Sequence, residues 1–295
     1  MSVATLDRVD DALGRRVSMR PLALLRIPIG LIALVHLWPF LDDARHGVQY
    51  RDTFYEPYAS WYPELSRGAY GVLLGVGAVA AVCMTLGLLT RLACAVTFGV
   101  VAYNLFLSTT HVHSNRAFLT IVLAGLAVAP CGRELSLDAW LRGRRGLPPL
   151  DKLAPAWPLL LLRFEDVTVY AASGLSKLLD PDWFGGTVTW LRVVHTRRQL
   201  EASPLPAWVT DLLLERGFHT YAAKVIVLTE LFIAVGLCFR RTRVAAVMVA
   251  VCFHVAIQLT ASVEVFSYLA IATLLIWLDP SPPAREPDSP SPSSA

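Results

Sequence analysis

The side chains best suited to chemistry in this sequence are ionisable groups within or at the ends of long apolar runs. Lys177 ends one such run, and His254 lies inside another, with Gln258 one helical turn after it. A free lysine amine or an imidazole can remove a proton from a substrate. An ionisable residue inside a membrane segment is costly and usually marks a functional site. Lys177 and His254 are therefore candidate catalytic residues, although Lys177 is equally explained as a side chain that reaches the lipid headgroups.

A polar turn between two other apolar runs supplies a second set of candidates. It contains His111, His113, Asn115 and Arg116. Histidines at helix ends are as often solvated as functional, so both interpretations of His111 and His113 stay open. If this turn lies at the same membrane depth as Lys177, the two sets together provide the clustering that an active site needs.

Four other charged residues are interpreted as structural. Arg26 lies in the first apolar run, and Arg163, Glu165 and Asp166 lie near the start of the run that ends at Lys177. We expect Arg–carboxylate pairing across helices, because an unpaired buried charge would cost about 3–5 kcal/mol. Glu230, which lies in a later apolar run, has no assigned role at this stage.

Membrane helices must position these side chains. The chain has 295 residues, of which 55% are apolar and 17% charged, against about 25% charged residues in soluble domains. The runs lack the alternation of a membrane barrel, and helices satisfy their own backbone hydrogen bonds in lipid. The sequence thus predicts an all-α, polytopic membrane bundle. About eight transmembrane helices are expected, at 22–40, 69–89, 92–108, 117–131, 157–178, 221–239, 244–260 and 264–278.

The distribution of basic residues predicts the orientation of this bundle. Arginine and lysine cluster before the first helix and in the second, fourth and sixth connections, which all fall on one side if the eight helices are real. The positive-inside rule places that side in the cytoplasm. Both termini are then cytoplasmic in a multi-pass protein of the cell (inner) membrane. Lys177 and the polar turn fall on the extracytoplasmic side, where we expect the active site.

The remaining composition limits other functions. Residues 1–20 form a polar cytoplasmic segment, 21–279 the membrane domain, and 280–295 a Pro- and Ser-rich tail that we expect to be disordered. The net charge of +3 is too small to indicate nucleic-acid binding. The five cysteines form no CxxC pair, so no metal site is expected.

Several segments resemble a known family. The stretch from Tyr170 to Trp183, YAASGLSKLLDPDW, is similar to a segment of the vitamin K-dependent γ-glutamyl carboxylases and of their bacterial relatives, the horizontally transferred transmembrane (HTTM) domain proteins. Lys177 matches the catalytic lysine of that segment, with one extra leucine before Asp180. Weaker similarities follow in the family's order. They are LALLRIPIG at 22–30, GLLTR at 87–91, HSNRAFL at 113–119, and FH at 253–254 followed by FSYL at 266–269.

The resemblance implies an activity and its site. In the carboxylases a lysine deprotonates a reduced vitamin K hydroquinone, oxygen reacts, and the strong base that results allows a substrate glutamate to take up CO₂. Carried over, Lys177, His254 and His113 are the catalytic candidates, although His113 and Arg116 compete for the position of the family's turn histidine. The residues expected to bind the quinone are His111, Asn115, Gln258 and Trp183.

The implied cofactor is reduced vitamin K or menaquinone, with O₂ and CO₂ as co-substrates. The implied partners are the lipid bilayer, the lipid quinone and a Glu-containing peptide or protein. The large soluble region that holds the substrate in eukaryotic carboxylases has no counterpart in this sequence. A non-catalytic membrane partner for peptide binding or maturation is therefore the main alternative to an enzyme. A transporter ranks last, because the sequence shows no internal repeat.

Overall fold

A computed structural model describes residues 3–52, 54–261 and 265–278. Each of the eight predicted apolar segments corresponds to a helix whose ends differ from the prediction by a few residues. These helices are α2 (Arg20–Arg45), α3 (Arg67–Leu86), α4 (Thr90–Leu107), α5 (Ser114–Val128), α7 (Trp157–Leu179), α12 (Arg216–Cys238), α13 (Arg243–Ala261) and α14 (Phe266–Thr273), which continues as the 3-10 helix η3 (Leu274–Trp277). The predicted tail at 280–295 lies outside the described residues.

Four of these helices, α2, α3, α4 and α12, are long and apolar enough to cross a membrane. Helices α5, α13 and α14 are apolar but shorter. Helix α7 is long enough but carries charges near its start. The chain is therefore a multi-pass helical membrane protein, while the count of eight spans and the side of each terminus remain predictions.

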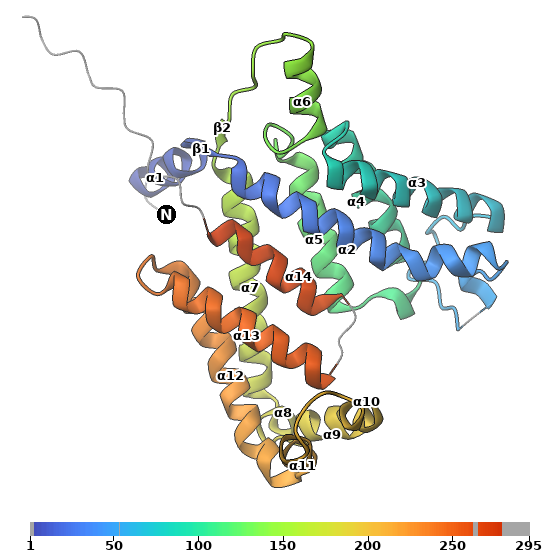
Figure 1. The fold of residues 1–295 in the computed structure, drawn as a ribbon, viewed down its shortest axis with the longest axis vertical. Helices are drawn as coiled ribbons and strands as arrows, with labels where there is room; N and C mark the ends of the chain where they lie inside the picture. Colours follow the sequence, from blue (N-terminus) through green and yellow to red (C-terminus); the bar gives the residue numbers. More distant parts are fainter. Residues whose placement is uncertain (1–2, 53, 262–264, 279–295) are drawn as a thin grey trace, which may run out of the picture.

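The long helices form two groups (Figure 1). Helices α2, α3, α4 and α5 pack successively against one another, and α12 packs against both α7 and α13. Helix α14, the last in the chain, contacts α2 from the first group and α13 from the second. Helix α5 also contacts α7, so the two groups are joined at more than one place.

Shorter elements connect the long helices. The N-terminal segment forms α1 (Val3–Gly14), and α6 (Leu137–Arg144) follows α5. The connection from α7 to α12 folds into four short helices, which are α8 (Pro181–Phe184), α9 (Thr187–His195), α10 (Arg197–Glu201) and α11 (Ala207–Leu214). Two 3-10 turns, η1 (Tyr50–Asp52) and η2 (Thr109–His111), lie in the connections after α2 and α4.

The prediction of an all-α fold missed two short strands. Strand β1 (Arg16–Ser18) pairs antiparallel with β2 (Leu153–Pro155), and Val17 lies opposite Ala154. Three-residue strands are too short to show alternation in a sequence. Their pairing places the start of α2 beside the start of α7 (Figure 1).

Candidate active site

Lys177 lies in a hydrogen-bonded cluster between α7 and α12. Its Nζ donates to Glu230 Oε1 at 2.5 Å and to Ser173 Oγ at 2.8 Å. Ser173 Oγ in turn donates to the same Glu230 oxygen at 3.1 Å. The side chains of Lys177 and Glu230 are only 16% and 6% exposed. A cation and a carboxylate are thus held together almost completely within the protein.

The local sequence of α7 explains this geometry. Ser173 precedes Lys177 by four residues, so both side chains lie on one face of the helix. Gly174 lets α12 come close, because a Cβ at this position would lie 2.9 Å from a methyl carbon of Leu231. Glu230, the neighbour of Leu231, is thereby brought within hydrogen-bonding distance of Lys177. The small residues before the lysine therefore have a packing role as well as a polar one.

The ring of Trp183 covers another side of Lys177. The Nζ lies 4.9 Å from the ring centroid, and Arg192 from α9 lies 5.1 Å from the same ring. Asp180 fixes this corner, because its side chain accepts hydrogen bonds from the backbone N–H groups of Asp182 and Trp183 at the start of α8. A cation over an indole face is stabilised by the ring quadrupole. The predicted neighbours Lys177 and Trp183 are therefore in contact.

His254 from α13 adjoins this group. Its Nε2 is hydrogen-bonded to the Tyr170 hydroxyl at 2.8 Å, and both residues are buried. Tyr170 lies seven residues before Lys177 on α7, which is two helical turns away on the same face. The ring of Phe266, on α14, lies 5.5 Å from the imidazole. We call Tyr170, Ser173, Lys177, Glu230 and His254 the lysine cluster.

Several buried polar atoms at and near the lysine cluster have no hydrogen-bond partner. They are Glu230 Oε2, His254 Nδ1, Gln258 Oε1 and Ser267 Oγ. Gln258 lies one helical turn after His254, and Ser267 follows Phe266. Leaving a buried polar atom unpaired costs about 1–3 kcal/mol. Four such atoms on three neighbouring helices can bind a small polar group brought in by a ligand.

The turn histidines have different contacts. His111 Nδ1 is hydrogen-bonded to the Asn104 carbonyl oxygen at 2.9 Å. His113 is exposed, and its Nδ1 accepts a hydrogen bond from the backbone N–H of Asn115 at the start of α5. Burial lowers the pKa of His111, the Asn104 carbonyl raises it, and the charge of Arg116 lowers it. Their polar contacts are thus with α4 and α5, whereas those of Lys177 are with Ser173 of its own helix and with α12.

Two sets of aromatic contacts lie near the turn histidines and near the lysine cluster. The Phe40 ring lies 5.3 Å from His111 and 5.8 Å from His36. Elsewhere, Phe118 of α5 lies 6.4 Å from Phe266, which contacts His254. Aromatic packing through α14 therefore links α5 to the lysine cluster.

The residues expected to form structural ion pairs have other partners. Arg26 is completely buried, and its guanidinium donates to the carbonyl oxygens of Met84 at 2.5 Å and Leu135 at 2.6 Å. Arg26 is therefore held by backbone carbonyls and not by the expected carboxylate. Gly87, with φ +70°, makes room for it, since a Cβ there would lie 2.3 Å from Arg26 Nη1.

Arg163 and Asp166 anchor the C-terminal turn. Arg163 donates to the Ile276 carbonyl oxygen at 2.6 Å, and its guanidinium lies over the Trp277 ring. Asp166 accepts a hydrogen bond from the Trp277 indole N–H at 2.9 Å. Glu165, one position earlier, is half-buried. These contacts fasten η3 to α7.

Sequence reasoning missed three members of the lysine cluster, namely Tyr170, Ser173 and Glu230. A signal for Glu230 was present, because it is the lone acidic residue in a long apolar run and such residues usually have a partner. Ser173 stands four positions before the candidate lysine, which is the spacing of neighbours on one helix face. Tyr170 gave no comparable signal.

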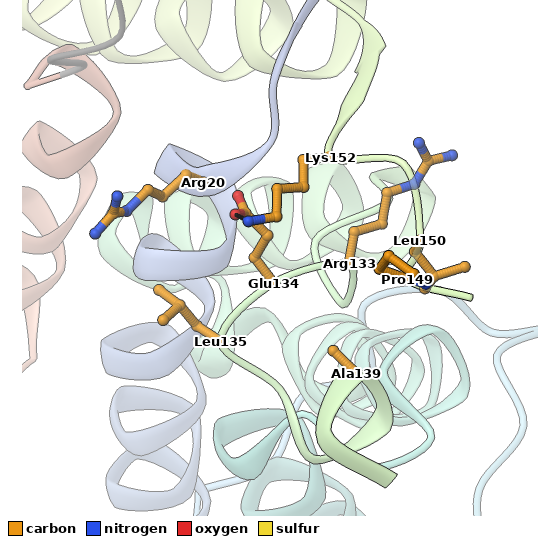
Figure 2. A pocket seen from close by; sticks show the side chains of 8 residues that line it. All are labelled: Arg20, Arg133, Glu134, Leu135, Ala139, Pro149, Leu150 and Lys152. Carbon is orange, nitrogen blue, oxygen red and sulfur yellow. Dashed lines mark ion pairs between the residues drawn. The ribbon is translucent and has the colours of Figure 1, made fainter. Parts of the chain in front are cut away.

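Two pockets lie elsewhere. One, of about 410 Å³, is lined by Arg20, Arg133, Glu134, Lys152 and four less polar residues (Figure 2). Lys152 and Glu134 form an ion pair at 3.2 Å in it, and the two guanidinium groups point away from that pair. It lies on the predicted cytoplasmic side. The second, of about 430 Å³, is an apolar groove between α2 and α14 that reaches Val265. Lys177 lines neither pocket.

The fold and the buried lysine cluster define the class: a polytopic helical membrane protein with ionisable groups enclosed between its helices. Comparison with protein families gives the particular family. The model of the HTTM domain matches residues 15–281, and the chain therefore belongs to the HTTM domain family. This is the domain of proteins related to vitamin K-dependent carboxylases. Searches of curated proteins and of solved structures found no match.

Proposed function

We propose that the protein is a membrane enzyme that oxidises a reduced naphthoquinone to its epoxide, with Lys177 as the base. The observation that carries the proposal is the enclosed position of the Lys177 amine, 2.5 Å from Glu230, whose second carboxylate oxygen is buried without a hydrogen-bond partner. Membership of the HTTM family supports the same chemistry. In the overall reaction, a hydroquinone and O₂ yield a quinone epoxide and water.

The residues near Lys177 suit such a substrate. A hydroquinone has two hydroxyl groups on an apolar ring system. The unpaired His254 Nδ1 and Gln258 Oε1 can hydrogen-bond hydroxyl groups, while Phe253 and Phe266 present apolar rings around His254. The substrate is lipid-soluble, so we propose that it enters from the bilayer. The apolar groove between α2 and α14 ends at Val265, next to Phe266, and is the proposed route.

Lys177 performs the first step in this proposal. Its free amine removes the proton from a hydroquinone hydroxyl, which makes the ring reactive toward O₂. Carboxylation of a peptide glutamate with CO₂ is the second half-reaction that the same site would support, and it is assayed separately.

The test compares three forms of the purified protein in lipid vesicles. Each receives reduced vitamin K or reduced menaquinone and O₂, and epoxide is followed by chromatography. We expect wild-type protein to form epoxide and Lys177→Ala to lose at least about 100-fold of the rate, as is typical for removal of a general base. Lys224→Ala is the matched control, because Lys224 is an exposed lysine on α12. It should retain the wild-type rate.

Two results would contradict the enzyme proposal. One is the absence of epoxide from folded wild-type protein with every quinone tried. The other is an equal rate in Lys177→Ala and wild type. Either result would favour the alternative function, a membrane protein that binds a peptide during its maturation.

A further inference from the structure

The polar pocket of about 410 Å³ has no part in the chemistry proposed for Lys177. It brings together three cationic residues from three separate segments of the chain, which are Arg20, Arg133 and Lys152 (Figure 2). Glu134 is the one carboxylate among the eight described residues that line it, so the lining carries a net charge of +2. A pocket with this charge attracts an anion.

The charge of Glu134 is already balanced within the pocket. Its Oε1 lies 3.2 Å from Lys152 Nζ, and the lysine side chain is still 67% exposed. Both guanidinium groups point away from this pair (Figure 2). Arg20 is exposed, and no described group accepts a hydrogen bond from its guanidinium. The positive charge of the pocket is therefore available to a ligand.

Arg133 fixes the backbone that carries Lys152. Its Nη1 donates to the carbonyl oxygens of Asp151 at 2.9 Å and of Leu153 at 2.8 Å, one residue on each side of the lysine. The other N–H groups of this guanidinium have no described acceptor. One arginine thus shapes the pocket and adds to its charge.

The pocket lies where membrane helices begin and end. Arg20 is the first residue of α2, Arg133 follows the end of α5, and Lys152 directly precedes β2, which leads into α7. Helix α2 is long and apolar enough to cross a membrane, so its first residue lies close to the lipid headgroups. This is the predicted cytoplasmic side, and the cytoplasmic leaflet is the one that carries anionic lipids.

Exposed apolar side chains adjoin these cations. Leu135 and Leu150 line the pocket and are 49% and 39% exposed. Trp140, on α6 next to the pocket, is 57% exposed, and the guanidinium of Arg144 lies 5.4 Å from its ring centroid. Tryptophan is enriched at the membrane–water interface. A soluble phosphate would gain nothing from these apolar groups, whereas a phospholipid carries both a phosphate and apolar chains.

We propose that this pocket binds the phosphate group of an anionic phospholipid. Arg20 and Lys152 are exposed at its rim and can turn toward a common phosphate. Leu135 and Leu150 then contact the first carbons of the acyl chains. The volume of about 410 Å³ is within the range of about 300–1,000 Å³ found for ligand pockets. The site is separate from the lysine cluster and does not depend on the proposed quinol oxidation.

The test measures lipid affinity of the purified full chain in neutral detergent micelles. Dioleoyl phosphatidylglycerol is added in steps, and bound lipid is counted by native mass spectrometry. Dioleoyl phosphatidylcholine has the same chains and a phosphate but no net charge, and we expect it to bind at least about fivefold more weakly, since one basic residue near the membrane surface changes affinity by about that factor.

Arg20→Gln is the key variant, because the Arg20 guanidinium has no described partner whose loss would disturb the fold. It should weaken phosphatidylglycerol binding about fivefold, and Arg20→Gln combined with Lys152→Gln about 25-fold. Arg241→Gln is the matched control, because Arg241 is exposed in the turn between α12 and α13 and does not line the pocket. It should bind like wild type.

Three results would overturn the proposal. One is equal binding of the two lipids by wild type, and another is wild-type affinity in the double variant. The third is displacement of phosphatidylglycerol by an equal concentration of glycerol 3-phosphate, which would identify a soluble phosphate compound as the ligand.

A second measurement needs no variant. Wild-type protein in phosphatidylcholine vesicles receives a small fraction of phosphatidylglycerol with a photoreactive diazirine near its headgroup. After illumination, the cross-linked peptides are identified by mass spectrometry. We expect cross-links within residues 133–152 and near Arg20. Cross-links spread evenly over all the basic connections would contradict a defined site.

Discussion

Two cations enclosed between helices, the buried Arg26 and the partly buried Lys177, have opposite environments. Arg26 lies at the junction of α2, α3 and the segment before α6, and its guanidinium bonds backbone carbonyl oxygens that cannot change their charge. Lys177 lies between α7 and α12 and bonds a carboxylate and a hydroxyl, which can exchange protons. The Arg26 site therefore joins elements of the fold, whereas the lysine cluster can take part in chemistry. The two sites differ above all in the groups that accept hydrogen bonds from the cation.

The largest expected effect tests this contrast through stability. Arg26→Met removes the donors that satisfy buried carbonyls, and hydrogen bonds from charged groups are worth about 1.5–3 kcal/mol each. We expect a loss of about 3 kcal/mol or more, measured by SDS-induced unfolding in micelles. The double variant Lys177→Met with Glu230→Met should lose far less, because replacing a whole buried ion pair by apolar residues of similar size leaves no unpaired charge. Equal losses in the two variants would break the comparison.

A smaller effect is expected inside the lysine cluster. Tyr170→Phe removes the hydrogen bond to His254 Nε2 and leaves both imidazole nitrogens without a hydrogen-bond partner. We expect a loss of about 1–2 kcal/mol in the same unfolding assay. Tyr268→Phe is the control, because Tyr268 is 56% exposed on α14. If both variants unfold alike, the Tyr170–His254 contact adds nothing to the cluster.

The smallest expected effect is on the pH dependence of stability. It concerns His111, a titratable group that lies outside the spanning helices. Its pKa is lowered, chiefly by burial, so the folded state favours the neutral ring. The unfolded chain then binds more protons than the folded one as the pH falls below the ordinary histidine value of about 6.5. The stability contributed by His111 is present above that pH and declines as the pH falls.

His111→Asn should make unfolding less sensitive to pH between neutral and mildly acidic conditions. The other histidines are present in both proteins, so the difference between the two pH curves follows from the loss of the His111 ring. Identical curves would show that the turn does not hold the ring in its neutral form.

The sequence predicts where the helices lie, but it does not predict which side chains pair between them. Long apolar runs predict helices because lipid offers no hydrogen bonds to an exposed backbone. The resemblance around Lys177 identified one member of the site. Pairing of Lys177 with Glu230 depends on α7 lying against α12, which is a tertiary contact between positions 53 residues apart. No local pattern encodes it.

Arg26 is a second case in which the sequence did not predict the hydrogen-bond partner. A buried arginine suggests an ion pair with a carboxylate on another helix, but carbonyls at the end of a helix and in a turn satisfy it equally well. Which acceptor is used depends on Gly87, whose missing side chain admits the guanidinium beside the α3–α4 turn. The role of that glycine becomes apparent only when the two helices are placed together.

The position of α14 has a consequence for how the protein is made. Its Phe266 contacts Phe118 on one side and His254 on the other, although it is the last helix of the chain. During synthesis from the N-terminus, α2 to α5 can assemble with their neighbours long before α14 emerges. The surroundings of His254 are completed only after α14 has been translated. A ribosome-bound chain that stops short of Phe266 would therefore carry every member of the lysine cluster and still lack the ring that packs against its imidazole.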